Sequence, residues 1–141
     1  MLTIPAVMRR KILIVDDELD FAELAQYRLA EAGYEFQTAT NSTDALNLAW
    51  DSPPDLILLD LLLPDLDGLS VCEIFARHPA TQHIPIIMIT AAGSDTTRFS
   101  AEVAGARRFF AKPVDFAELK TTMEMLLLES TPKGPPPSSP G

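Results

Sequence analysis

The chain has 141 residues, of which 47% are hydrophobic, and 20 acidic against 11 basic side chains give it a formal net charge of −9. This length suits one soluble globular domain that buries about two-thirds of its unfolded surface, and a second full domain does not fit. DNA- and RNA-binding proteins present basic surfaces, so this acidic chain is not expected to bind nucleic acid directly. The single cysteine, Cys72, cannot form an intramolecular disulfide, so the composition does not point to an oxidising compartment.

Membrane insertion and secretion are also not expected. No apolar run approaches the roughly 20 residues that span a bilayer, and the first ten residues lack the long hydrophobic region of a signal peptide. We therefore expect a cytoplasmic protein that does not associate with membranes.

Hydrophobic patterning predicts five strands, each followed by a helix. Continuous apolar runs at 12–15, 56–59 and 84–89 are typical of strands that are buried on both faces. Residues 34–39 alternate in polarity and the run at 109–111 is short, as expected for edge strands. Apolar residues at helical spacing follow, for example within 21–32 and 116–127. The predicted strands cover about 11–16, 34–39, 55–60, 84–90 and 107–112.

This alternation predicts an α/β fold, a doubly wound five-stranded parallel sheet with helices on both faces. Placing the apolar strands inside gives the order 2-1-3-4-5, which is flavodoxin-like, with a ligand crevice at the carboxyl ends of strands 1 and 3. We expect an N-terminal extension at 1–10 and a folded domain at 11–129. The segment 130–141 is expected to be a disordered tail or a linker, because five of its last ten residues are proline.

Polar side chains follow four of the predicted strands. They are Asp16, Asp17 and Glu18 after the first, Asp60 after the third, Thr90 after the fourth, and Lys112 with Pro113 after the fifth. Adjacent strands lie about 4.8 Å apart, so these side chains converge, and clustered carboxylates favour a bound cation such as Mg²⁺. A lysine and a hydroxyl beside them suit a phosphoryl group, and an aspartate there can serve as a nucleophile.

Each piece also has a simpler interpretation. Residues 16–18 could cap the following helix, and Asp60 with Pro64 and Gly68 could form an ordinary turn. The convergence of all the pieces on one crevice favours a functional site.

Four segments together resemble the receiver domains of two-component response regulators: residues 12–18 (ILIVDDE), 60–68 (DLLLPDLDG), 90–92 (TAA) and 109–113 (FFAKP). The resemblance covers about residues 10–128. It implies that Asp60 accepts a phosphoryl group from the phosphohistidine of a histidine kinase or a phosphotransfer protein. It also implies a signalling module without substrate turnover of its own, apart from slow loss of the phosphoryl group.

The resemblance assigns roles to the residues of the crevice. Mg²⁺, which Mn²⁺ can replace, would be bound by Asp17 directly, by Asp16 through water, by Asp60 and by the backbone carbonyl of Leu62. Thr90 and Lys112 would each contact a phosphoryl oxygen. The Lys112–Pro113 peptide bond is expected to be cis.

The resemblance also implies a switch in which Thr90 moves inward and Phe109 turns into the vacated space. Because Phe109 lacks a tyrosine hydroxyl, we expect burial alone to hold its inward state. The response would be read on the fourth helix, fifth strand and fifth helix (about 95–128) by a downstream protein or a fused output domain. Homodimers through these helices are also compatible with the family. Phe99 and Val103 are expected to pack the fourth helix.

Two apolar positions lead us to expect a long-lived phosphoryl group. Leu62 and Ala92 stand where the family tunes phosphoryl lifetime, and neither side chain can hydrogen-bond an attacking water. A lifetime no longer than that of a Leu62→Asn, Ala92→Glu variant would contradict this expectation.

Two other functions compete with phosphoacceptor signalling. One is a receiver-like scaffold that binds partners without phosphorylation. The other is a Mg²⁺-dependent phosphohydrolase with an aspartate nucleophile, but the haloacid-dehalogenase-type motif needs an aspartate where this chain has Glu18, and more chain for a cap.

Overall fold

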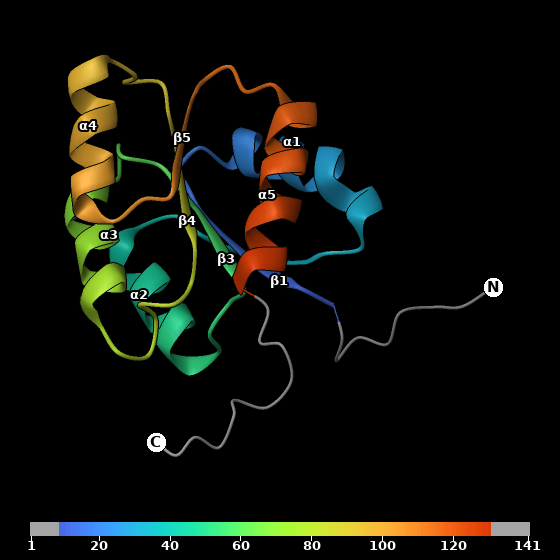
Figure 1. Cartoon of the computed structure of the whole chain (residues 1–141), viewed down its shortest axis with the longest axis horizontal. Coiled ribbons are helices and arrows are strands. Elements are labelled where there is room, and N and C mark those ends of the chain that lie inside the picture. Colours follow the sequence, from blue (N-terminus) through green and yellow to red (C-terminus); the bar gives the residue numbers. More distant parts are fainter. Residues whose placement is uncertain (1–8, 131–141) are drawn as a thin grey trace.

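Five strands and five α-helices alternate along the chain, and the computed structural model describes residues 9–130 (Figure 1). The strands are β1 (Lys11–Val15), β2 (Glu35–Ala39), β3 (Leu56–Leu59), β4 (Ile86–Thr90) and β5 (Arg108–Ala111). The helices are α1 (Leu19–Leu29), α2 (Ser42–Asp51), α3 (Gly68–Arg77), α4 (Asp95–Ala104) and α5 (Phe116–Ser130), and a short 3-10 helix (Ala30–Ala32) follows α1. The tail expected after residue 130 and most of the extension expected at 1–10 lie outside the described residues.

All strand pairs are parallel and the order is β2-β1-β3-β4-β5, which confirms the predicted doubly wound topology. The strands are slightly shorter than predicted. The fourth begins at Ile86 because Pro85 has no N–H for the ladder, although the carbonyl of Pro85 still accepts from the N–H of Ile57. Within residues 9–130, no helix has the length and hydrophobicity required to cross a membrane.

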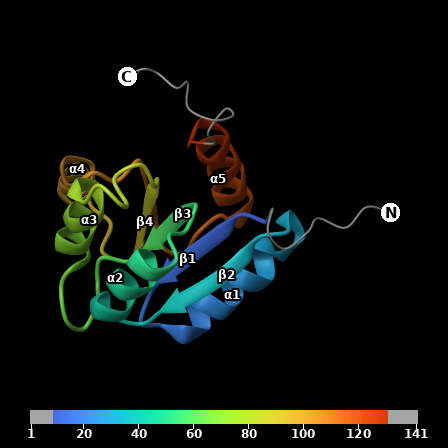
Figure 2. The same ribbon diagram turned by 90° about the horizontal axis from the view of Figure 1, so that it is seen from below.

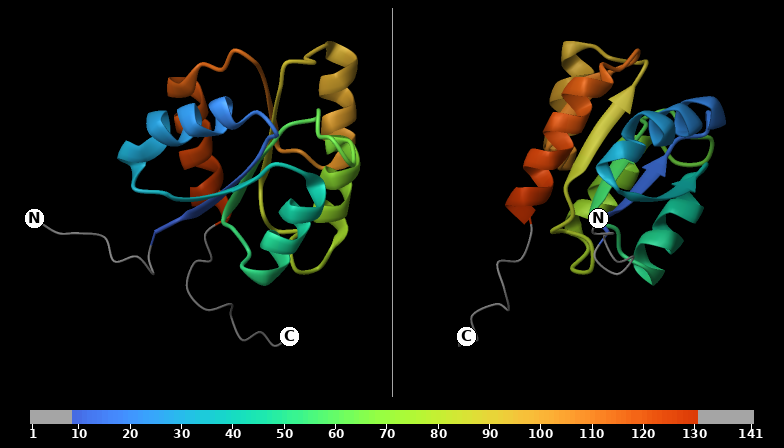
Figure 3. Two further views of the ribbon diagram at one scale, coloured as in Figure 1. Left: turned by 180° about the vertical axis from the view of Figure 1, so that it is seen from behind. Right: turned by 90° about the vertical axis from the view of Figure 1, so that its right-hand side faces the viewer.

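Two apolar cores lie on opposite faces of the sheet. Alternate residues of β1 show the division, because Leu13 and Val15 join one core and Ile12 and Ile14 join the other. In Figure 2 and in the left view of Figure 3, α2, α3 and α4 lie on one side of the sheet, and α1 and α5 lie on the other. With both faces covered, the carboxyl ends of the central strands are left as the place for a polar site.

Candidate functional site

Backbone hydrogen bonds continue the sheet by one residue beyond the strands that carry the predicted site. They run from the N–H of Asp16 to Ala39 O (3.0 Å), from Asp60 to Val15 O (2.9 Å) and from Lys112 to Thr90 O (2.9 Å). The backbone of each of these residues is therefore held by the sheet.

The Lys112 ammonium joins three carboxylates of the crevice. It lies 2.8 Å from Asp16 Oδ2, 2.8 Å from Glu18 Oε1 and 3.1 Å from Asp60 Oδ2. Asp16 and Asp60 are buried, whereas Glu18 reaches in from the surface. The ammonium also lies 4.3 Å from the centre of the Phe21 ring, which adds a cation–π contact. The structure brings Asp16, Asp60 and Lys112 together, as the strand ends predict, and it shows Glu18 and Phe21 as further partners of the lysine.

The second oxygens of the two buried carboxylates are held by the backbone. Asp16 Oδ1 accepts from the N–H of Glu18 (2.8 Å), and Asp60 Oδ1 accepts from the N–H of Leu62 (3.1 Å). Glu18 is the N-cap of α1 but makes no side-chain cap bond, so the interpretation of residues 16–18 as a helix cap lacks the bond it requires. The peptide bond between Lys112 and Pro113 is cis.

Burial and charge pairing act on the protonation of the crevice. Burial favours the neutral forms, but the hydrogen bonds from Lys112 to Asp16 and Glu18 outweigh it and raise the pKa of the lysine well above its usual value. For Asp16, burial is the larger effect and raises the pKa of the carboxyl, although the bonds from Lys112 and from the Glu18 N–H oppose it. The lysine therefore stays charged, and its hydrogen bond to Asp16 favours the ionised form of that buried carboxyl.

Three carboxylates are close enough to share a metal ion. Asp16, Asp17 and Asp60 each offer an oxygen, and these oxygens lie within 4.8 Å of one another. Carboxylate oxygens of this kind, with solvent access through the exposed Asp17, suit a hard divalent cation that retains water. The donor set fits the metal that the sequence predicts.

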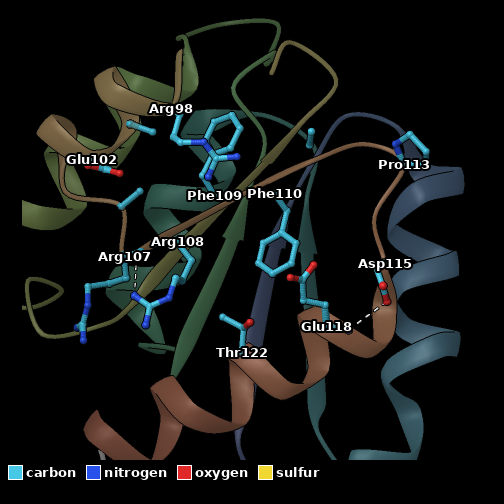
Figure 4. Close-up of a pocket in the computed structure, with 13 residues that line it drawn as sticks. Arg98, Glu102, Arg107, Arg108, Phe109, Phe110, Pro113, Asp115, Glu118 and Thr122 are labelled. Carbon is cyan, nitrogen blue, oxygen red and sulfur yellow. Dashed lines mark hydrogen bonds between the residues drawn. The ribbon is translucent and has the colours of Figure 1, made fainter. Parts of the chain in front are cut away.

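Thr90 and Phe109 lie on neighbouring strands beside this cluster. Thr90 is fully buried, and its hydroxyl accepts from the N–H of Ala92 at 3.2 Å. The Phe109 ring already points inward and is 9% exposed, and the Arg98 guanidinium covers it at 4.9 Å from the ring centre (Figure 4). The expectation that burial alone holds this ring is therefore incomplete, because a cation–π contact contributes as well.

The loop after β3 is fixed by two residues that the sequence analysis did not assign to the site. Gly68 begins α3 so close to the backbone of Asp60 and Leu61 that a Cβ would collide with it. Asp65 accepts hydrogen bonds from the N–H groups of Ser42 (2.9 Å) and Thr43 (3.1 Å) at the start of α2. Gly68 is visible in the sequence, eight residues after Asp60, but the partners of Asp65 depend on where α2 lies in the fold.

A groove of about 490 Å³ lies on the surface formed by α4, β5 and α5. Its rim is charged, and Figure 4 shows Arg98, Arg107, Arg108, Glu102, Asp115 and Glu118 around it. This is the face expected to report the state of the switch, and ionic groups dominate it.

Comparison with known families agrees with the site. Residues 12–124 match the family model for the response regulator receiver domain. The chain belongs to this family. It is therefore a receiver domain of two-component systems, a class of signalling modules that are generally not enzymes.

Curated relatives of this receiver domain are longer proteins. The DNA-binding dual master transcriptional regulator RpaA of Synechocystis is 37% identical over 117 residues, which cover 83% of this chain and 48% of RpaA. The alkaline phosphatase synthesis transcriptional regulatory protein PhoP of Bacillus subtilis is 36% identical over 123 residues, which cover 87% of this chain and 50% of PhoP. Response regulator PleD of Caulobacter vibrioides is 38% identical, and the matched part is 24% of PleD. The chain therefore spans about half the length of RpaA and of PhoP, and a smaller part of PleD.

Solved receiver domains have the same fold. The receiver domain of NtrX from Brucella abortus superposes with a TM-score of 0.77 at 34% identity, covering 83% of this chain and 98% of that one. A CheY-like receiver domain from Methanospirillum hungatei gives a TM-score of 0.81 at 27% identity, covering 86% of this chain and 96% of that one.

Proposed function

We propose that this receiver domain accepts a phosphoryl group on Asp60 from the phosphohistidine of a histidine kinase or a phosphotransfer protein. The observation that supports this most strongly is the convergence of Asp16, Asp60 and Lys112 through contacts of 2.8 and 3.1 Å at the carboxyl ends of the strands. Family membership supports it as well, because receiver domains are the signal-accepting partners of histidine kinases.

The chemical step is a phosphoryl transfer between two side chains. A carboxylate oxygen of Asp60 attacks phosphorus, a P–O bond forms, and the P–N bond to the donor histidine breaks with its electron pair leaving on the imidazole nitrogen. The backbone N–H of Leu62 and the Lys112 ammonium hold the carboxylate in place for this attack.

Charge on the transferred group is then balanced by the surrounding residues. Asp17, Asp60 and the Leu62 carbonyl would hold Mg²⁺ directly and Asp16 would hold it through water, and the bound ion would supply positive charge to the phosphoryl oxygens. Lys112 pairs with one phosphoryl oxygen and the Thr90 hydroxyl donates to another, which requires Thr90 to give up its contact with the Ala92 N–H. This exchange would couple phosphorylation to the packing around Phe109, whose ring is already buried, and to the charged face of α4, β5 and α5, where a downstream protein or an output domain binds.

The test is the intact mass of the protein after incubation with Mg²⁺ and acetyl phosphate. We expect one added phosphoryl group, which is absent from Asp60→Asn and from a sample treated with a chelator. Thr90→Ala should slow the addition about 10²-fold, as loss of an oxyanion donor does. Thr81→Ala is the matched control, because Thr81 is equally buried but lies in the loop before β4, where its hydroxyl donates to Phe75 O of α3.

Two outcomes would overturn the proposal. Folded protein that binds Mg²⁺ but gains no mass would favour a scaffold that works without phosphorylation. Repeated hydrolysis of a phosphate ester would favour the phosphohydrolase.

A further inference from the structure

The exposed apolar side chains of α4 lie beside α3 and not over the charged groove at β5. Phe99 is 67% exposed and Val103 is 68% exposed, so the expectation that they pack the helix was wrong. They are four residues apart and therefore lie on the same side of α4, one turn from each other. Isolated exposed apolar residues are common, but two large ones on one helix ridge form a surface that water solvates poorly.

This ridge borders a groove of about 430 Å³ between α3 and α4. The lining residues are Asp67, Leu69, Ser70, Glu73, Phe99, Ser100, Val103 and Ala104. The α4 side supplies the large apolar groups, whereas the α3 side supplies the carboxylates. A groove between two packed helices, with a ridge along one edge, matches the shape of a third helix.

The charge of the groove is negative. Asp67 and Glu73 are its only ionisable lining residues. The Ser70 N–H lowers the pKa of the Asp67 carboxyl, which stays ionised. Glu73 pairs with Arg77 at 3.7 Å, but both side chains are exposed, and such a pair neutralises the carboxylate weakly.

We propose that this groove, defined by Phe99 and Val103 with Asp67 and Glu73, binds an amphipathic helix of another protein. The helix carries two apolar side chains one turn apart, which pack on the ridge, and lysine or arginine residues that face the α3 carboxylates. This contact lies on the α3 side of α4, whereas the charged groove is formed by residues of α4, β5 and α5.

A second copy of this chain is a poor occupant. None of the five α-helices within residues 9–130 carries more than one lysine or arginine, as their sequences show. Two copies, each with a net charge of −9, also repel each other, whereas a basic helix is attracted to the acidic groove.

The first test uses a synthetic peptide helix with leucines at i and i+4 flanked by lysines, and a twin with glutamates in place of the lysines. Fluorescence anisotropy with the full chain should give at least about tenfold tighter binding for the lysine peptide. The double variant Phe99→Ser, Val103→Ser should lose about tenfold in affinity, because truncating apolar anchors removes most of the binding energy. Leu128→Ser should bind as the unchanged chain does, since Leu128 is 72% exposed on α5 and outside the groove.

A second comparison tests the charge of the groove. Glu73→Lys and Glu23→Lys change the net charge equally, and both residues are exposed, on α3 and α1. Glu73→Lys should weaken the lysine peptide about threefold more than Glu23→Lys does, which is the scale of an exposed charge pair. Equal effects of these two variants, unchanged affinity in the Phe99 and Val103 double variant, or equal loss in Leu128→Ser would overturn the proposal. Mass addition at Asp60 in the same variants reports separately on phosphoryl acceptance.

Discussion

The Asp65 carboxylate, in the loop that follows Asp60, accepts a 2.9 Å hydrogen bond from the backbone N–H of Ser42, the first residue of α2. It also accepts from the N–H of Thr43 at 3.1 Å. The N–H of Asp44, in the same first turn, donates to the side-chain oxygen of Asn41, the N-cap residue, at 2.8 Å. The start of α2 is therefore held partly by its own cap and partly by the loop that follows Asp60.

We predict that Asp65→Ala weakens Mg²⁺ binding about tenfold, the lower end of the effect of removing a residue that orients a metal ligand. The reason is that the loop loses its attachment to α2, and with it the fixed position of Leu62, whose N–H holds Asp60 and whose carbonyl is a proposed ligand. Asn41→Ala removes a cap from the same helix without touching the loop. Both variants should have a lower melting temperature, but only Asp65→Ala should require more Mg²⁺ in a titration. Equal Mg²⁺ affinities in the two variants would assign Asp65 a purely structural role.

The same hydrogen bonds predict how stability depends on pH. The N–H of Ser42, followed by the other donors, holds the pKa of the Asp65 carboxyl well below its usual range. A carboxyl whose pKa is lower in the folded state stabilises the folded protein. This stabilisation is complete above the unfolded pKa of about 3.9, and it is lost progressively as the pH falls below that value toward the folded pKa. Asp65→Asn should therefore lose less melting temperature than the unchanged chain between about pH 5 and pH 3. Parallel curves for the two proteins would contradict this.

The site could be predicted from the sequence to the extent that strand ends determine it. The apolar runs that end before Asp16, Asp60 and Lys112 show where each strand stops, and parallel strands bring their carboxyl ends to one edge. Asp65 and Arg98 could not be assigned in this way. Their partners, Ser42 and Phe109, belong to other elements, so their roles depend on loop path and side-chain direction, which have no period in the sequence.

Gly68→Ala should destabilise the protein strongly. An added Cβ at this position would collide with the carbonyl oxygen of Asp60 and with Leu61 Cα, both of which belong to the backbone and cannot rotate away. We expect a loss of about 3 kcal/mol in the free energy of unfolding, the upper end for forcing a methyl group into a packed region. Gly93→Ala is the control. Its added Cβ would lie 3.1 Å from the methyl of Ala111, and the next nearest atom would be 3.6 Å away. Urea denaturation of the two variants measures the difference, and equal losses would show that the backbone of Asp60 can shift.

Arg98 and Phe109 should be energetically coupled. The guanidinium lies 4.9 Å from the ring centre, and such contacts contribute about 0.5–1 kcal/mol at exposed sites. A double-mutant cycle with Arg98→Ala and Phe109→Leu, measured by urea denaturation, should give a coupling energy of that size. The same cycle with Phe110→Leu in place of Phe109→Leu should give a value near zero. No coupling in the first cycle would mean that burial alone holds the Phe109 ring inward.

Lys112→Met should strengthen Mg²⁺ binding while it impairs the switch. The ammonium bonds to Asp16 and Asp60, so it competes with a metal ion for their oxygens and reduces the negative charge that attracts it. Methionine has similar length and no charge, so we expect about tenfold tighter Mg²⁺ binding, and a melting temperature that falls without Mg²⁺ and recovers when it is added. Lys120→Met changes the net charge equally from α5, at a residue outside the cluster, and should leave Mg²⁺ affinity unchanged. Weaker Mg²⁺ binding in Lys112→Met would mean that the lysine positions the carboxylates for the metal instead of competing with it.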